Sequence, residues 1–175
     1  LIALKDYIQD KDKILVGFNS LSFDDLILKA IVSGKVSTEK DIYALATSII
    51  ERTEEKLIYR LKWKTPISWH ASVDLMQLSF SVAKASLKEI GVRFNWPLIQ
   101  ELPYAPHESL DEEKKQNIIS YCRNDVAITA ELWSKSFEEV KLRMELEKLY
   151  GVNVISHSRP ECAEEILKHQ YLQGS

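Results

Sequence analysis

Apolar and polar residues recur along the chain with two different periods, and both appear at its start. Apolar residues three or four positions apart predict a helix that ends near Ile8. The run KILVGF, at residues 13–18, is short and almost continuously apolar. Such a run is typical of a buried strand in a parallel sheet. The chain is therefore expected to begin with a helix followed by a strand.

Two further helices are predicted after this strand. The stretch 23–34 has helical spacing and ends in Gly34, and glycine is the residue that most often closes a helix at the C′ position. The stretch 37–52 has the same spacing, and Ser37 is its expected N-cap.

The middle of the chain is predicted to return to strands. Residues 57–64 alternate between apolar and basic side chains, which indicates an amphipathic strand. Its basic face would either follow a DNA backbone or protect an edge strand from aggregation. That face consists of Arg60, Lys62 and Lys64. Residues 71–78 are expected to form a second buried strand, and residues 84–92 a short helix ending near Gly91.

Helices dominate the predicted C-terminal half. Residues 94–108 contain three prolines and are expected to form a loop. Ser109 and Glu112 then match a capping box, which predicts the start of a long helix that runs to about Tyr150. Ser158 is expected to begin a last helix by the same logic. Strands that alternate with helices indicate an α/β fold.

Composition narrows the class of protein without fixing a function. The 175 residues are 45% apolar and 28% charged, as in a globular domain. The net charge of −3 excludes a uniformly basic, histone-like protein, although a local basic patch beside an acidic metal site is compatible with it. Cys122 and Cys162 form neither a zinc pattern nor a disulfide framework, which favours a reducing cytoplasm. No apolar run has the length of a membrane span, so no membrane partner is expected.

Two aspartates and a tyrosine carry the candidate chemistry. Asp24 directly follows the predicted strand and its turn, at the edge where α/β sheets place their sites. Asp125 lies within the long helix, where aspartate is a poor helix former, and Tyr121 lies one turn earlier on the same face. Two carboxylates brought together favour Mg²⁺ or Mn²⁺. A tyrosine beside them can orient water, and this combination suits hydrolysis of a phosphodiester bond.

The residues around these side chains resemble two motifs of the DnaQ-like 3′–5′ exonucleases. NSLSFD, from Asn19 to Asp24, is similar to the second motif of that family, in which an asparagine precedes an aromatic residue and an aspartate. YCRND, from Tyr121 to Asp125, is similar to the third motif in its tyrosine form. The resemblance covers roughly residues 1–142 and is nearest to the proofreading exonucleases associated with phage DNA polymerases.

The resemblance implies a ribonuclease H-like α/β fold and a two-metal mechanism. Asp24 and Asp125 would be two of the four carboxylates that hold two Mg²⁺ or Mn²⁺ ions, and Tyr121 would orient the attacking water. Asn19 and Phe23 would contact the substrate, which would be the single-stranded 3′ end of DNA. A DNA polymerase domain or subunit is the implied protein partner. The implied location is the cytoplasm, of the host cell if a phage encodes the chain.

The first motif of the family, Asp-x-Glu, is expected on a strand upstream of residue 14, where few residues are present. Asp111 and Glu113 match it formally, but at a helix N-terminus such acids satisfy the cap and the dipole. The chain also begins with Leu1 instead of methionine. We therefore expect an N-terminally incomplete exonuclease domain at residues 1–150. It would lack the first strands of the sheet and would be inactive by itself. Residues 151–175 would form a C-terminal helical extension that connects to a following domain.

Each candidate residue also has a purely structural interpretation. Asp24 could serve only the N-terminus of its helix. Asp125 could be a solvated acid paired with Arg123. Tyr121 could pack in the core with its hydroxyl at the rim, and Asn19 could shape a turn.

Two further aspartates, Asp25 and Asp74, were considered beside the candidate residues. Asp25 is expected to favour the start of the helix and nothing more. Asp74 interrupts an apolar strand, and a buried charge needs a partner. We favour a structural role for Asp74 over a place beside the metals.

The function has alternatives of a different class. The same fold could bind a nucleic-acid end, or brace a polymerase domain, without catalysis. A second alternative is an exonuclease of the same family directed at RNA, because contacts to the 2′-hydroxyl leave no local sequence signature.

Overall fold

The computed structural model divides the chain into two compact units, an N-terminal unit, Leu1–Asp74, and a C-terminal unit, Leu75–Ser175. The structure describes residues 2–8, 10, 12–53, 55, 58, 72–78, 85–105 and 108–173. Within these residues, no helix combines the length and the apolar character needed to cross a bilayer. The predicted strand at residues 57–64 lies almost entirely outside the described part of the chain.

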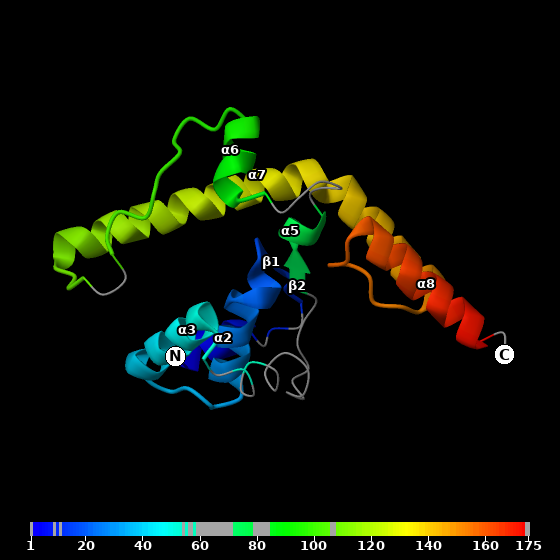
Figure 1. Ribbon diagram of the computed structural model, residues 1–175, viewed down its shortest axis with the longest axis horizontal. Coiled ribbons are helices and arrows are strands. Elements are labelled where there is room, and N and C mark those ends of the chain that lie inside the picture. The colour runs from blue at the N-terminus through cyan, green and yellow to red at the C-terminus, as the bar shows by residue number, and fades with distance from the viewer. Residues whose placement is uncertain are drawn as a thin grey trace. The chain divides into compact units, whose positions relative to one another are not determined.

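Helices make up most of the described residues of the N-terminal unit (Figure 1). Its described elements are α1 (Ile2–Ile8), β1 (Leu15–Gly17), η1 (Ser20–Ser22), α2 (Asp24–Val32), α3 (Glu39–Glu51) and β2 (Ser72–Asp74). The three helices expected from the apolar spacing in this unit are therefore confirmed.

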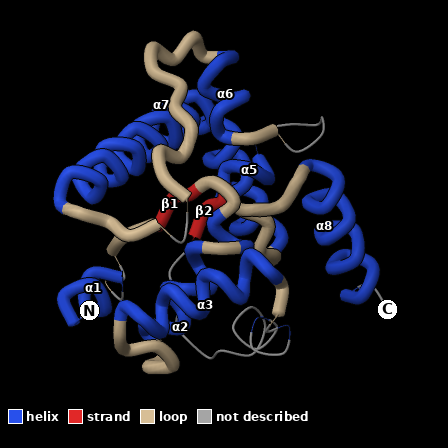
Figure 2. Tube along the Cα trace, turned by 60° about the vertical axis from the view of Figure 1, so that its left-hand side comes forward, coloured by secondary structure: helices blue, strands red, loops and turns tan. Residues whose placement is uncertain are grey.

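β1 and β2 form a short parallel pair, visible side by side in Figure 2. Val16 is opposite Val73, and Gly17 is opposite Asp74. The predicted parallel pairing of the first strand is confirmed. Its predicted burial is wrong, because the β1 residues are only half-buried and Ile14 beside them is exposed. In β2, by contrast, Val73 is fully buried.

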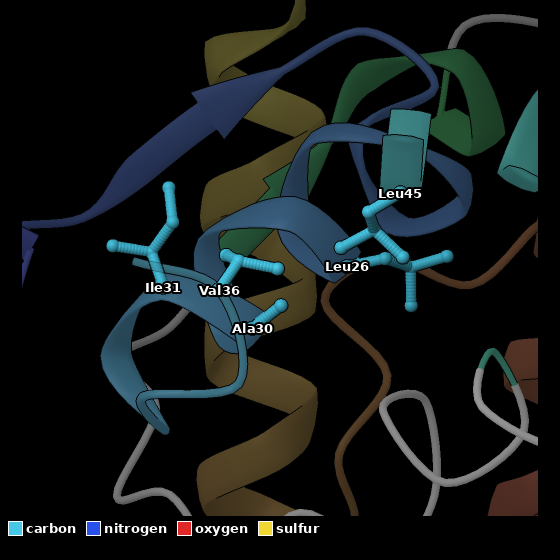
Figure 3. Packing of buried hydrophobic residues seen from close by; sticks show 5 residues of the cluster. All are labelled: Leu26, Ala30, Ile31, Val36 and Leu45. Atoms are coloured by element: carbon cyan, nitrogen blue, oxygen red, sulfur yellow. The ribbon is translucent and has the colours of Figure 1, made fainter. Parts of the chain in front are cut away.

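The core of the N-terminal unit lies between α2 and α3. Apolar side chains at helical spacing on α2 meet one from α3 and one from the turn between them (Figure 3). This cluster consists of Leu26, Ala30, Ile31, Val36 and Leu45. Burial of each large aliphatic side chain contributes roughly 1.5–3 kcal/mol, so this cluster fixes the helix that begins at Asp24.

Individual capping residues determine where α2 ends and where α3 begins. Gly34, after the last turn of α2, has a φ of 70°, which confirms it as the C′ residue. The predicted N-cap of α3 is wrong by one residue, because Thr38 and not Ser37 caps it. Thr38 pairs reciprocally with Asp41 in a capping box: the Asp41 N–H donates to Thr38 Oγ1 at 3.1 Å, and the Thr38 N–H donates to Asp41 Oδ2 at 3.0 Å.

Helices are the only regular elements among the described residues of the C-terminal unit. Its elements are α5 (Leu75–Leu78), α6 (Leu87–Arg93), α7 (Glu112–Tyr150) and α8 (Arg159–Gln173). α5, α6 and α8 all pack on the long helix α7. The helices predicted near residues 84–92 and up to Tyr150 are confirmed.

Two predictions in this unit are wrong. Residues 75–78 were predicted to belong to the strand at residues 71–78, but they form helix α5. Leu, Met and Gln are good helix formers, and periodicity alone does not separate a short apolar strand from a helical turn. The N-cap of α7 is Asp111 and not Ser109: the Lys114 N–H donates to Asp111 Oδ1 at 2.8 Å. This hydrogen bond also gives Asp111 the structural role that its position predicted.

The turn from α7 into α8 is fixed by a small apolar cluster and a cap. Val152, Val154 and Cys162 form the buried centre of the cluster. Ser158 caps α8 as expected, because its N–H donates to Glu161 Oε2 at 2.8 Å and its hydroxyl accepts from the Glu161 N–H at 3.5 Å. The predicted α/β, ribonuclease H-like fold stays a prediction, since the described residues are mostly helical with one two-stranded sheet.

Candidate functional site

The predicted site residues fall into two groups, one in each unit. Asn19, Phe23 and Asp24 belong to the N-terminal unit, whereas Tyr121 and Asp125 belong to the C-terminal unit. The first group lies on the turn from β1 into α2, and the second lies on α7. That the two groups meet at one site stays a prediction.

The first group lies on a tight turn that leads from β1 into α2. Asn19 adopts the left-handed conformation, with a φ of 58°, and precedes the single 3₁₀ turn of η1. Asparagine tolerates this conformation better than most residues, so Asn19 shapes the turn, and its contact with a substrate stays a prediction. Gly17 allows the turn to close, because a Cβ there would lie only 2.5 Å from Ser20 Cβ.

Asp74 holds this turn against the end of β2. Its side chain is 1% exposed. Oδ1 accepts the backbone N–H of Asn19 at 2.8 Å, and Oδ2 accepts the backbone N–H of Leu21 at 3.2 Å. A buried carboxylate is stabilised by such charge-assisted hydrogen bonds. The predicted structural role of Asp74 is therefore confirmed, and its partners are the backbone of the candidate motif itself.

Asp24 is the first residue of α2, and Phe23 is the N-cap whose carbonyl accepts the N–H of Leu26 at 3.1 Å. Asp24 is exposed as a residue, yet partial burial of its carboxylate raises its pKa. The negative charges of Asp25 and Asp74 add to this rise, while a backbone hydrogen bond opposes it. A divalent cation beside Asp24 would relieve this repulsion, so the local charges fit a metal ligand.

Asp25 was missed as a candidate in the sequence. It is 2% exposed, which is far more burial than an acid serving only the helix dipole requires. Together with Asp24 and Asp74 it makes this end of the N-terminal unit strongly negative. The repeated aspartate after Phe23 was the only sequence signal for it.

The second group consists of two residues of α7. Tyr121 and Asp125 are one turn apart on this helix, and both are half-buried. Burial, a side-chain hydrogen bond with Asp125 and the charge of Asp125 together raise the pKa of Tyr121 to about 12. The phenol therefore keeps its proton at every physiological pH. The predicted pairing of this tyrosine and aspartate on one helix face is confirmed.

Asn124, one residue before Asp125, makes two hydrogen bonds that hold a loop on α7. The side chain of Trp96 donates from Nε1 to Asn124 Oδ1 at 2.9 Å, and Asn124 Nδ2 donates to the carbonyl of Leu98 at 3.0 Å. The loop after α6 is thereby held on α7, next to the candidate pair. Sequence reasoning missed this contact, because the tryptophan and the asparagine are 28 residues apart.

Asp24 and Asp125 are the residues that would hold a divalent cation, since each offers a carboxylate in a negative or hydrogen-bonded setting. Among the described residues, no three His, Cys, Asp or Glu side chains gather closely enough to form a metal-binding group on their own. Cys122 and Cys162 are free thiols. That Asp24 and Asp125 hold a metal ion stays a prediction.

The resemblance to the exonuclease family stays a prediction from the two motifs. Asn19 to Asp24 form a turn clamped by Asp74, and Tyr121 and Asp125 form a pair on one helix face. Comparison of the chain with protein-family models, with curated proteins and with solved structures found no match.

Proposed function

We propose that this chain is part of a metal-dependent 3′–5′ exonuclease that acts on DNA ends during proofreading or end processing. The observation that carries the proposal is the placement of Tyr121 and Asp125 one turn apart on α7, where burial and then the Asp125 carboxylate raise the pKa of the phenol. A tyrosine and an aspartate one turn apart on a helix are also the residues of the third exonuclease motif in its tyrosine form. The turn that positions Asp24 supports the same proposal.

Asp24 and Asp125 would hold two Mg²⁺ or Mn²⁺ ions together with carboxylates contributed by an Asp-x-Glu motif elsewhere in the protein. The bound ions would supply positive charge that polarises the phosphodiester and stabilises the leaving 3′ oxygen. Asp24 fits this role because two neighbouring carboxylates already disfavour its lone negative charge.

Tyr121 would orient the attacking water. Its pKa of about 12 keeps the proton on the phenol oxygen, and the nearby Asp125 carboxylate would favour a proton that points toward it. The oxygen lone pairs are then free to accept a hydrogen bond from water. A water held in this way presents its own lone pair in one direction, which is the benefit of a positioned group in hydrolysis.

The substrate would be the single-stranded 3′ end of DNA. Asn19 is exposed at the clamped turn, and Phe23 follows it at the start of α2. Bases of a single strand stack on aromatic rings, and amide side chains bind sugar and base edges. The proposed fold is ribonuclease H-like, and the proposed protein partner is a DNA polymerase domain or subunit.

The test is degradation of a 3′-labelled single-stranded oligonucleotide by the protein in its natural sequence context, with Mg²⁺. We expect Asp125→Asn to abolish turnover while binding of the DNA end stays measurable. We expect Tyr121→Phe to reduce turnover less, because the ring remains and only the hydroxyl is lost. Glu138→Gln is the matched control, since it removes an exposed acid from the same helix and should leave the rate unchanged.

Wild-type rates for Asp125→Asn would show that Asp125 is not a ligand and would overturn the proposal. End binding without any Mg²⁺-dependent degradation would indicate a non-catalytic module instead. A parallel RNA oligonucleotide separates the two nucleic acids, and the proposal expects the DNA to be degraded faster.

A further inference from the structure

Helix α7 carries apolar side chains on two opposite faces. Ile128 and Leu132 form a buried face, and a Cβ added to Gly91 of α6 would lie 3.5 Å from Ile128 Cδ1. Val126 and Phe137 lie about 160–180° around the helix from Ile128. Their side chains are 68% and 49% exposed. A helix that packs on one side normally presents polar residues on the other, so this second apolar face needs its own explanation.

The second face follows a heptad repeat. Its residues are separated by seven positions or alternately by four and three, and we call them the outer stripe: Ile119, Val126, Ala130, Trp133, Phe137 and Met144. Trp133 is half-buried and the other five are exposed. The rings of Trp133 and Phe137 meet edge to face, with their centroids 5.9 Å apart. This spacing is typical of the seam between two helices of a coiled coil.

The order of side-chain sizes in the outer stripe fits a second copy of the same helix. An antiparallel copy, related by a two-fold axis at the middle of the stripe, would place Ala130 opposite Trp133. The same axis would place Val126 opposite Phe137. The smallest side chain of the stripe would thus face the largest. Such alternation of small and large residues fills the space between two helices without voids.

Charge selects the antiparallel arrangement. Arg123 is exposed and occupies the position of the repeat between Ile119 and Val126. A parallel copy would bring the two Arg123 side chains together, whereas an antiparallel copy keeps them about 25 Å apart along the axis. The residues that flank the middle of the stripe are small and uncharged, so two copies can approach without repulsion. These residues are Ala127, Thr129, Ser134 and Ser136.

The length of the outer stripe bounds the strength of such a contact. From Ile119 to Met144 the stripe is about 38 Å long, at 1.5 Å per residue. A contact of this length and one helix wide lies at the small end of specific interfaces, at or below about 1,200 Å² in total. An association through it would therefore be weak and reversible.

We propose that two copies of this chain associate through the outer stripe of α7 as an antiparallel pair of helices. Tyr121 and Asp125 lie on the side of α7 that carries Ile128, so they take no part in this contact. The interface therefore goes beyond the proposed function and does not depend on it.

The test is sedimentation equilibrium of the protein in its natural sequence context, from low micromolar to near-millimolar concentration, with EDTA and without DNA. We expect a reversible equilibrium of monomer and dimer. Phe137→Glu should weaken dimerisation about ten-fold or more, because each copy loses an apolar side chain at the seam. Leu149→Glu is the matched control, since it changes an exposed apolar residue of α7 outside the stripe and should leave dimerisation unchanged.

A monomer at every concentration would overturn the inference. So would a Phe137→Glu variant that dimerises as strongly as the unchanged protein. Ala130→Trp separates the proposed pairing from non-specific association. Ala130 is exposed, so the larger side chain stays outside the core of the single chain. In the antiparallel pair it would collide with Trp133 and weaken dimerisation, whereas non-specific apolar association would become stronger and contradict the pairing.

A distance between two spin labels gives the direction of the second helix. The label is attached at Glu145→Cys, an exposed position outside the stripe, in a chain that also carries Cys122→Ser. The two labels should lie about 40 Å apart in the antiparallel pair and roughly 10–20 Å apart in a parallel pair. A distance in the shorter range would overturn the antiparallel arrangement.

Discussion

Asp74 holds Asn19 across 55 residues of sequence, because its Oδ1 accepts the Asn19 backbone N–H at 2.8 Å. The second carboxylate oxygen holds Leu21 in the same way. A single buried side chain thus sets the path of the chain between β1 and α2. The position of Asp24, the first residue of α2, follows from that path.

We predict that Asp74→Ala lowers the free energy of unfolding by about 2–4 kcal/mol, because two backbone donors lose a charged acceptor. Denaturant unfolding followed by circular dichroism measures this change. Asp24→Asn is the matched control in the same unit. Asp24 is exposed and its pKa is raised, so its ionised form is disfavoured in the folded state.

The direction of the stability change in Asp24→Asn follows from the raised pKa of Asp24. A carboxyl group with a raised folded pKa contributes stability below its unfolded pKa, for which the reference value is 3.8, and loses it as pH rises through the folded pKa. Asp24→Asn should therefore leave the stability unchanged, or raise it slightly, at neutral pH. A loss of stability as large as that of Asp74→Ala would contradict the account.

Tyr121 is predicted to titrate later than an ordinary tyrosine. Its pKa of about 12 lies above the reference value of 10.0, mainly because of burial and then because of the hydrogen bond with Asp125. Its contribution to stability is therefore complete below pH 10.0 and is lost as pH rises toward 12.

Tyrosinate absorbance measures this titration when the curve of Tyr121→Phe is subtracted from that of the unchanged chain. Asp125→Asn should move the Tyr121 midpoint only part of the way back toward the reference value, since burial remains. A midpoint at the reference value in the unchanged chain would mean that the phenol is neither buried nor paired with Asp125.

Two glycines of similar packing should respond differently to an added methyl group. In Gly17→Ala the new Cβ would lie 2.5 Å from Ser20 Cβ, an atom attached directly to the backbone, so the turn must move. In Gly91→Ala the nearest atom, at 2.7 Å, is the terminal Cδ1 of Ile99, which can rotate away.

We expect Gly17→Ala to lower the melting temperature clearly and Gly91→Ala to lower it little, in thermal unfolding of the two variants side by side. The cost of overpacking is about 1–3 kcal/mol where the neighbours cannot yield. Equal losses in both variants would show that the turn after β1 is looser than the structure indicates.

Local patterns were readable from the sequence, and contacts across the chain were not. The pair of Tyr121 and Asp125 followed from helical spacing, because two residues four apart on a helix necessarily share a face. The burial of Asp74 followed from its apolar strand. Its partners Asn19 and Leu21 did not, because nothing in the local sequence states which turn lies beside β2.

The errors at element boundaries have the same origin. Ser109 and Asp111 are both acceptable caps, and the choice between them depends on where the helix packs. Leu75 to Leu78 are apolar in a way that fits a strand or a helical turn, and packing on α7 decides for the helix. Asp25 looked like an ordinary first-turn acid, and its burial became visible only in the structure.

The central claim is that Asp24 and Asp125 bind the same divalent ions, and Mn²⁺ titration followed by electron paramagnetic resonance tests it most directly. The protein in its natural sequence context is compared with Asp24→Asn, Asp125→Asn and the double variant. We predict that each single variant weakens Mn²⁺ binding about ten-fold or more, and that the double variant loses less than the two effects combined, because residues of one site are not additive. Unchanged Mn²⁺ binding in either single variant, or fully additive losses in the double variant, would contradict the claim.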